Sequence, residues 1–127
     1  MGRKVLIVDD SGSLRTLVRL ALQQAGFETV EAVDGQDACG KLRGNHVDLI
    51  LCDVNMPNMD GLSFLTHPKI RANFKRTPVI LLSTESHESK KAEGKAAGAR
   101  AWITKPFRRS TLLDAVNKLC VPANQAA

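Results

Sequence analysis

The chain contains no tyrosine, one tryptophan and four phenylalanines among its 127 residues. Proteins that bind single-stranded nucleic acid usually stack bases on aromatic side chains, and this chain has few of them and no matching motif. We therefore expect no nucleic-acid partner, although the chain carries a formal net charge of +5.

Long hydrophobic runs are also missing. The longest apolar stretches, such as residues 5–8 and 79–82, are far shorter than the roughly 18 residues of a membrane span. The first four residues lead directly into one of these stretches, which is too short for the hydrophobic region of a secretory signal. We expect a cytoplasmic protein without a membrane segment.

Cysteine is scarce, with Cys39, Cys52 and Cys120 far apart in the chain. There is no Cys-x-x-Cys pair and no histidine at ligand spacing, so neither a zinc site nor a disulfide framework is indicated. An odd number of separate cysteines fits reduced thiols in a reducing compartment.

The length and composition indicate one globular domain. Hydrophobic residues at 43% and charged residues at 24% are ordinary values, and 127 residues can bury a sufficient core without a metal or disulfide. We expect a single domain over residues 1–127, with a core at about 3–120 and a frayed tail at 121–127.

The charge is distributed unevenly along the chain. Residues 1–63 contain nine acidic and six basic residues, whereas residues 64–127 contain four acidic and twelve basic ones. The basic residues of the second half are dispersed, which favours a charged protein partner over nucleic acid.

Apolar segments alternate with segments of helical spacing along the chain. Strands are expected at 4–10, 27–32, 47–53, 78–83 and 99–104, and helices at 14–25, 36–43, 86–97 and 109–119. A third helix within 62–77 should be kinked, delayed or split by Pro68. This alternation predicts an α/β fold with a parallel, doubly wound sheet covered on both faces by helices.

The burial expected for each strand also predicts the strand order. The first, third and fourth strands are continuously apolar, which is typical of central strands, whereas the second alternates and the fifth is short. These patterns favour the flavodoxin-like order 2-1-3-4-5, in which ligands bind beyond the carboxyl ends of the strands.

Polar residues follow the strand ends at which such a fold binds its ligand. Asp9 and Asp10 close the first strand, Asp53 the third and Ser83 the fourth, and Lys105 follows the fifth. Each aspartate alone could simply cap a helix or turn. Together at one edge, three carboxylates repel one another unless a cation lies among them, which indicates an oxygen-liganded Mg²⁺.

Four segments carry a family resemblance: VLIVDD at 5–10, DLILCDVNMPNMDG at 48–61, VILLST at 79–84 and KPF at 105–107. Each is weak alone, but in this order and at strand ends they are specific. Over residues 3–120 the chain resembles the receiver domain of two-component response regulators, in particular the stand-alone CheY type of chemotaxis.

The resemblance implies a metal-dependent phosphoacceptor. Asp53 would accept a phosphoryl group from a phosphohistidine or a small phosphodonor. Asp10, Asp53 and the backbone carbonyl of Asn55 would bind Mg²⁺, for which Mn²⁺ could substitute, and Asp9 would orient a metal-bound water. The protein would assist its own phosphorylation and dephosphorylation rather than act as an enzyme on other substrates.

The resemblance also implies residues that handle the phosphoryl group. Lys105 would pair with Asp53 and then with a phosphate oxygen, and Ser83 would donate a hydrogen bond to another. Asn55 and Glu85 match positions that tune the lifetime of the acyl phosphate.

Several residues would shape the loops around the site. Met56, Pro57 and Gly61 would form the loop beside the acceptor, with Gly61 permitting a backbone angle that a side chain forbids. Lys105–Pro106 is expected to be a cis peptide, as it is in this family.

The output surface would be the fourth helix, fifth strand and fifth helix of the expected set, at 86–97, 99–104 and 109–119. Trp102 matches a switching ring that is usually tyrosine or phenylalanine, and the alternative is a tryptophan packed at the sheet edge. The basic residues of this surface are Lys90, Lys91, Lys95, Arg100, Arg108, Arg109 and Lys118.

The implied partners are a sensor histidine kinase of the CheA type and a flagellar-switch or other acidic target on this basic surface. A phosphatase is a further candidate partner, and we expect a monomer. One alternative within the family is a phosphorelay receiver that passes its phosphate to a phosphotransfer protein or regulates another output.

Two alternatives belong to other classes of protein. A haloacid-dehalogenase-like phosphohydrolase would carry Asp-x-Asp after its first strand, whereas the nucleophile candidate here follows the third strand and is followed by Asn55. A flavodoxin-like cofactor binder would need a hydroxyl- and glycine-rich loop where Asp9 and Asp10 stand.

Overall fold

Five parallel strands form one sheet in the computed structural model, which describes residues 3–44, 46–54, 77–84, 88–96 and 98–119. The strands are β1 (Lys4–Val8), β2 (Glu28–Ala32), β3 (Leu49–Asp53), β4 (Val79–Ser83) and β5 (Ala101–Thr104). Their order is β2-β1-β3-β4-β5, which confirms the predicted doubly wound topology.

Burial separates the central strands from the edge strands, as the apolar patterns predicted. Every residue of β3 and β4 is buried, and so are four of the five residues of β1. In β2 and β5 most residues are half-buried or exposed. A strand between two neighbours and two helix layers must be apolar throughout, whereas an edge strand keeps one side in water.

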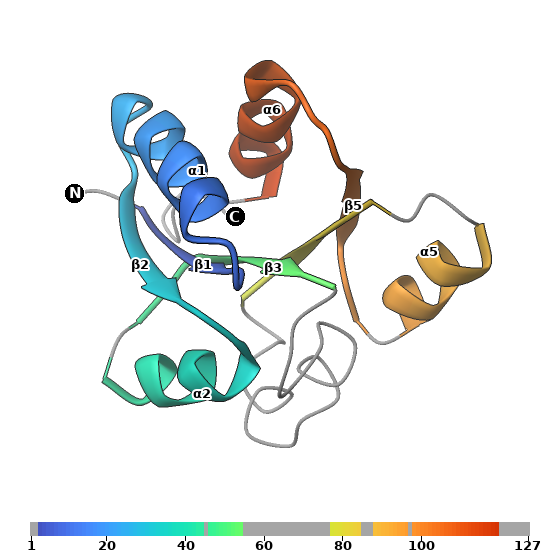
Figure 1. Cartoon of the computed structure of the whole chain (residues 1–127), viewed down its shortest axis with the longest axis horizontal. Helices are drawn as coiled ribbons and strands as arrows, with labels where there is room; N and C mark the ends of the chain where they lie inside the picture. Colours follow the sequence, from blue (N-terminus) through green and yellow to red (C-terminus); the bar gives the residue numbers. More distant parts are fainter. Residues whose placement is uncertain (1–2, 45, 55–76, 85–87, 97, 120–127) are drawn as a thin grey trace, which may run out of the picture.

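Four helices cover the sheet within the described residues: α1 (Gly12–Gln24), α2 (Gly35–Gly44), α5 (Glu88–Ala96) and α6 (Arg109–Leu119). Figure 1 shows α1 and α6 on one face of the sheet and α2 and α5 on the other. Each face carries its own core, one centred on Leu22, Leu51 and Leu112 and the other on Leu6 and Leu81.

Several predicted features fall outside the described residues. Among them are residues 62–76 of the segment expected to form the third helix, with Pro68, the tail at 121–127, and Cys120. Of the cysteines inside the described part, Cys52 is buried and Cys39 is half-buried, and both are thiols.

The ends of α1 and α2 are fixed by local signals. Ser11 precedes α1, and its hydroxyl accepts a hydrogen bond from the Leu14 amide at 3.3 Å. Before α2, Asp34 accepts from the Asp37 amide at 2.8 Å, and Asp37 accepts in return from the Val33 amide at 3.0 Å. These caps set the exact points at which the chain turns from strand to helix.

Glycines with positive φ terminate two helices. Gly26 after α1 has φ of 94°, and Gly98 after α5 has φ of 114°. A residue with a side chain would be strained at either angle. Each turn directs the chain into the next strand, β2 or β5.

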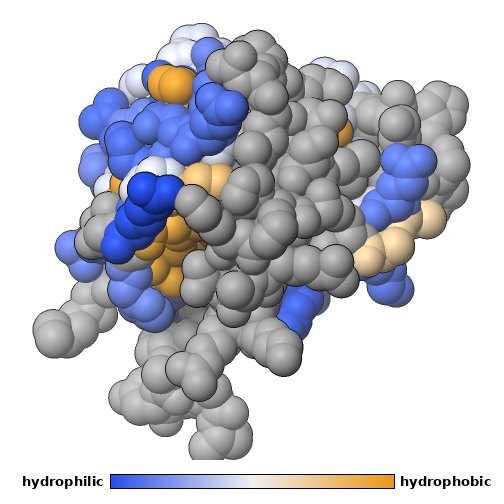
Figure 2. All heavy atoms as spheres, turned by 90° about the horizontal axis from the view of Figure 1, so that it is seen from below, coloured by the Kyte–Doolittle hydropathy of each residue, from blue (hydrophilic) through white to orange (hydrophobic). Residues whose placement is uncertain are grey.

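The described surface is mostly hydrophilic on the side of α2 and α5, with apolar residues visible only in small areas (Figure 2). Among the described residues, no helix is both long enough and apolar enough to cross a bilayer.

Candidate functional site

The site lies at the carboxyl edge of the sheet, where β1 and β3 end side by side. Val8 of β1 pairs with Cys52 of β3, so the next residues lie at the same level of the sheet edge, Asp9 directly after β1 and Asp53 as the last residue of β3. Both are nearly inaccessible, with 1% of Asp9 and 5% of Asp53 exposed. The register of two parallel strands therefore places two buried carboxyl groups together.

A third carboxyl group completes an acidic cluster. One carboxylate oxygen from each of Asp9, Asp10 and Asp53 lies within 4.8 Å of the others. Asp10 is exposed, whereas the other two are buried. The cluster is therefore accessible from solvent on the side of Asp10.

Lys105 reaches into this cluster from the loop after β5. Its Nζ lies 3.2 Å from Asp9 Oδ2 and 3.2 Å from Asp53 Oδ1. The Lys105 amide donates to the Ser83 carbonyl at 2.7 Å, which continues the pairing of β4 with β5. One ammonium offsets only part of the charge of three carboxylates, so the site still favours a further cation.

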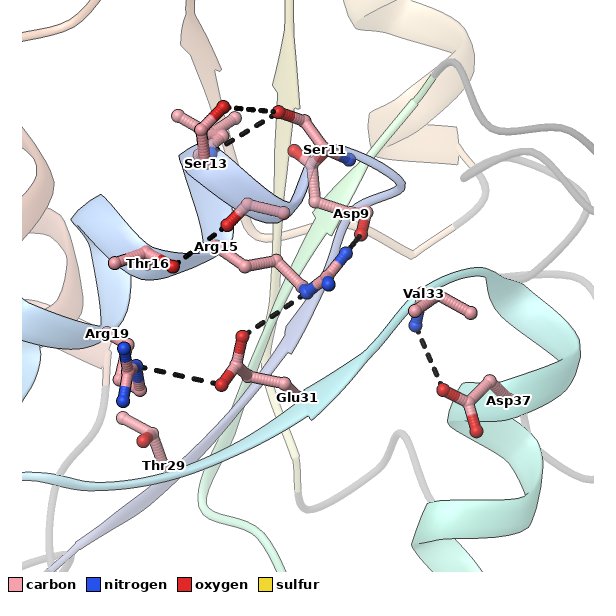
Figure 3. A network of polar contacts seen from close by, with 12 residues as sticks. Asp9, Ser11, Ser13, Arg15, Thr16, Arg19, Thr29, Glu31, Val33 and Asp37 are labelled. Atoms are coloured by element: carbon pink, nitrogen blue, oxygen red, sulfur yellow. Dashed lines mark hydrogen bonds and ion pairs between the residues drawn. The ribbon is translucent and has the colours of Figure 1, made fainter.

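Asp9 is held at each of its polar atoms. Its amide donates to the Ala32 carbonyl at 3.1 Å, and its Oδ1 accepts from the Ser11 amide at 2.8 Å. Its carbonyl accepts from Arg15 Nη1 at 2.6 Å (Figure 3), and its Oδ2 contacts Lys105. These contacts therefore hold the Asp9 side chain and backbone in one orientation beside Asp53.

The donor set fits a hard divalent cation. Carboxylate oxygens are the ligands that Mg²⁺ prefers, and it keeps several waters rather than a closed protein cage. A buried Asp53 beside an accessible Asp10 offers two such oxygens and leaves room for water on the open side. The expected third ligand, the carbonyl of Asn55, lies outside the described residues.

The other predicted site residues lie partly near the acidic cluster, partly away from it, and partly outside the described residues. Ser83 ends β4 with 0% exposure, and the Lys105–Pro106 peptide is cis. Trp102 lies in β5, away from the acidic cluster, and is half-buried. The remaining candidates lie outside the described residues and are Met56, Pro57, Gly61 and Glu85.

Trp102 packs against α5 at a glycine. A Cβ built on Gly94 would lie 3.1 Å from the indole Cε3 and Cζ3 and 2.9 Å from Leu81 Cδ1. The ring therefore occupies the space that a side chain at position 94 would need. Gly94 was not among the predicted site residues, and its only signal in the sequence is a glycine inside a polar helix.

Two hollows are found among the described residues, and the first of them shares Lys105 with the site. An apolar groove of about 560 Å³ lies between α1 and the start of α6, and Lys105 is part of its wall. The other residues of this groove include Leu14, Leu17, Leu20, Phe107 and Leu112. A smaller hollow of about 230 Å³ lies between α5 and β5 and is lined by Lys91, Lys95, Arg100 and Trp102.

The family model described as response regulator receiver domain matches residues 5–117. The chain belongs to this family. It is 37% identical over 122 residues to Protein PilG of Pseudomonas aeruginosa. The aligned region covers 96% of this chain and 90% of that protein.

Solved structures agree with this assignment. Chemotaxis protein CheY4 of Vibrio cholerae is 43% identical, with a TM-score of 0.88 and coverage of 94% of this chain and 99% of that one. TrrA of Thermotoga maritima, solved in complex with Mg²⁺-BeF, is 32% identical, with a TM-score of 0.80 and coverage of 92% and 98%.

Family membership gives the protein the role of a two-component signalling switch controlled by phosphorylation. Receiver domains bind Mg²⁺ through acidic residues and act between a histidine kinase and downstream targets. The match overrides the phosphohydrolase and flavin-binding alternatives.

Proposed function

We propose that Asp53 accepts a phosphoryl group from a phosphohistidine of a sensor kinase. The observation that carries this proposal is the environment of its carboxylate. Asp53 is 5% exposed, its Oδ1 lies 3.2 Å from Lys105 Nζ, and its ligand oxygen lies within 4.8 Å of those of Asp9 and Asp10.

The transfer needs little from the protein beyond position and charge. A carboxylate oxygen of Asp53 forms the new bond to phosphorus while the bond from phosphorus to the imidazole nitrogen breaks, and the bonding pair leaves with the imidazole. The Lys105 ammonium follows the developing charge from the carboxylate to a phosphoryl oxygen. The Ser83 hydroxyl, at the end of the adjacent strand, donates to another phosphoryl oxygen.

Mg²⁺, or Mn²⁺ in its place, neutralises the phosphoryl oxygens when bound. Asp10, Asp53 and the carbonyl of Asn55 are the proposed ligands. Asp9 is proposed to orient a metal-bound water, which is supported by the contacts that already engage both of its carboxylate oxygens. Water later hydrolyses the acyl phosphate, and we propose that Asn55 and Glu85 tune this rate.

We propose the surface of α5, β5 and α6 as the output face, in a chemotaxis-type pathway. The hollow beside Trp102 combines an indole with Lys91, Lys95 and Arg100, which suits an acidic peptide with an apolar side chain, such as a flagellar-switch segment. Movement of Ser83 toward the phosphoryl group would be transmitted to Trp102, which lies on the neighbouring strand.

We propose the apolar groove beside α1 as the docking place of the phosphodonor domain. It shares Lys105 with the acidic site, so a domain seated there brings its histidine to Asp53. Exposed Leu17 and Leu20 offer apolar contact, and Arg109 at the edge favours an acidic partner.

We further propose one receiver domain with a core at 3–120, acting as a cytoplasmic monomer.

Intact-mass analysis after treatment with a small acyl phosphate tests the acceptor. Wild type with Mg²⁺ should gain one phosphoryl group that hydroxylamine removes, and it should gain little without the metal. Asp53→Asn should gain none, whereas Asp114→Asn, which changes an exposed aspartate of α6, should behave as wild type. Uptake by Asp53→Asn would place the acceptor elsewhere.

A further inference from the structure

Arg15, in the first turn of α1, connects the acidic site to the edge strand. Its Nη1 donates to the Asp9 carbonyl at 2.6 Å, and its Nε donates to Glu31 Oε1 at 3.2 Å (Figure 3). Both bonds are charge-assisted, and the guanidinium is planar, so the two contacts together fix its orientation.

Glu31 is itself held in place on β2. Its Oε2 lies 3.6 Å from Arg19 Nε, one helical turn beyond Arg15, and its carbonyl accepts from Lys41 Nζ of α2 at 3.0 Å. The Arg15 side chain is 17% exposed, compared with 36% for Arg19 and Glu31. Arg15 is therefore supported by a neighbour that two other basic residues contact.

The Asp9 carbonyl belongs to the peptide that carries Asp10. The carbonyl oxygen of one residue and the amide nitrogen and Cα of the next lie in one plane. A hydrogen bond that fixes Asp9 O therefore fixes the plane from which the Asp10 side chain departs. Asp10 is exposed, so the direction of its carboxylate depends more on this backbone than on surrounding side chains.

We propose that Arg15, anchored by Glu31, is a positioning residue for the divalent-cation site. It holds the Asp9–Asp10 peptide so that the Asp10 carboxylate faces Asp9 and Asp53. This inference rests on the proposed function, because it assumes that these carboxylates bind Mg²⁺ or Mn²⁺.

Positioning and simple electrostatics predict opposite effects of removing Arg15. A guanidinium near a cation site repels the incoming cation, so loss of its charge alone would tighten metal binding. Loss of the hydrogen bond to Asp9 instead releases the peptide that directs Asp10, which weakens binding. The sign of the change in affinity therefore distinguishes the two.

Mn²⁺ binding to the full chain, measured by the electron paramagnetic resonance signal of the free ion, provides the test. Arg15→Met is expected to weaken binding by about tenfold, within the range found when residues that orient metal ligands are removed. Arg19→Met is the matched control, because it removes the same charge from the same helix and the same glutamate without touching Asp9. It is expected to bind Mn²⁺ as well as wild type or slightly better.

Arg15→Lys keeps the charge, but a single ammonium cannot reproduce the planar bridge between Asp9 and Glu31. It is also expected to bind Mn²⁺ more weakly, and it decides the question if Arg15→Met does not fold by circular dichroism. Wild-type or tighter binding by the folded Arg15 variant would overturn the positioning role.

Asp10→Asn separates this inference from the proposed function. If wild type binds Mn²⁺ and Asp10→Asn does not, the metal site stands, and the Arg15 variants judge the positioning role alone. If wild type binds no Mn²⁺, or Asp10→Asn binds it unchanged, the proposed metal site fails and the role of Arg15 fails with it.

Discussion

Gly94 in α5 provides a quantitative test of how Trp102 is seated. Replacing a helical glycine by alanine usually stabilises a protein by about 0.5–1 kcal/mol, because alanine loses less backbone entropy on folding. At Gly94, however, the new Cβ would lie 2.9 Å from Leu81 Cδ1 and 3.1 Å from two carbons of the Trp102 ring. Overpacking of this kind costs about 1–3 kcal/mol.

Gly94→Ala should therefore lower the free energy of unfolding by about 1 kcal/mol, since the overpacking exceeds the gain in helix propensity. Gly40→Ala is the matched control, because Gly40 lies in α2 with open space around its Cβ direction. That variant should gain about 0.5–1 kcal/mol. Urea denaturation followed by far-ultraviolet circular dichroism measures both differences, which correspond to about 4 °C in melting temperature per kcal/mol.

A double-mutant cycle with Trp102→Phe identifies the cause. The smaller ring lacks the fused six-membered part that approaches Gly94, so Gly94→Ala should cost less in this background. If Gly94→Ala stabilises wild type as much as Gly40→Ala does, the indole is not packed against α5 and the reasoning is refuted.

Four further outcomes are expected. Mg²⁺ at ten times its dissociation constant should stabilise wild type by about 1.4 kcal/mol in a thermal melt, and no shift would argue against a metal site. In metal-free buffer, Asp53→Asn should be more stable than wild type by about 1 kcal/mol in urea denaturation, because repulsion from two carboxylates exceeds attraction to one ammonium; a loss of stability would contradict this. Lys105→Met should lose about 2 kcal/mol in the same buffer and recover part of it with Mg²⁺, since it removes the ammonium that contacts both Asp9 and Asp53, and unchanged stability would show that the ammonium offsets little. Leu17→Glu should slow phosphorylation by a histidine-phosphorylated donor domain by about tenfold and leave the reaction with a small acyl phosphate unchanged, whereas equal rates with the protein donor would place the donor elsewhere.

Much of the fold was predictable because the order of apolar and polar residues in a strand reflects how deeply that strand is buried. Residues 49–53 and 79–83 are apolar up to a terminal Asp53 or Ser83 and proved to be central strands, whereas Glu28–Ala32 alternates and lies at the edge. The predicted ends of the strands were less accurate than the predicted order. The first strand was expected to reach Asp10 but ends at Val8, since Asp9 and Ser11 already form the turn into α1.

The position of the acidic site was also predictable, because parallel strands end at the same edge of a sheet. Asp9, Asp10 and Asp53 therefore gather there whatever the details of packing. The contacts that organise the site could not be predicted in the same way. The sequence contains nothing that pairs Arg15 with Glu31, or Gly94 with Trp102, because each pair depends on how a helix rotates and packs against a strand.

The amino-acid order alone determined the α/β class, the strand order and the edge at which carboxylates collect, since these follow from local apolar periodicity and from parallel strand direction. The tertiary structure decided that the Lys105 ammonium contacts both Asp9, which lies 96 residues earlier in the chain, and Asp53. It also decided that Arg15 donates to the carbonyl of the peptide between Asp9 and Asp10. Such contacts depend on how closely each helix packs on the sheet and on its rotation there. A local pattern of apolar and polar residues does not specify either one.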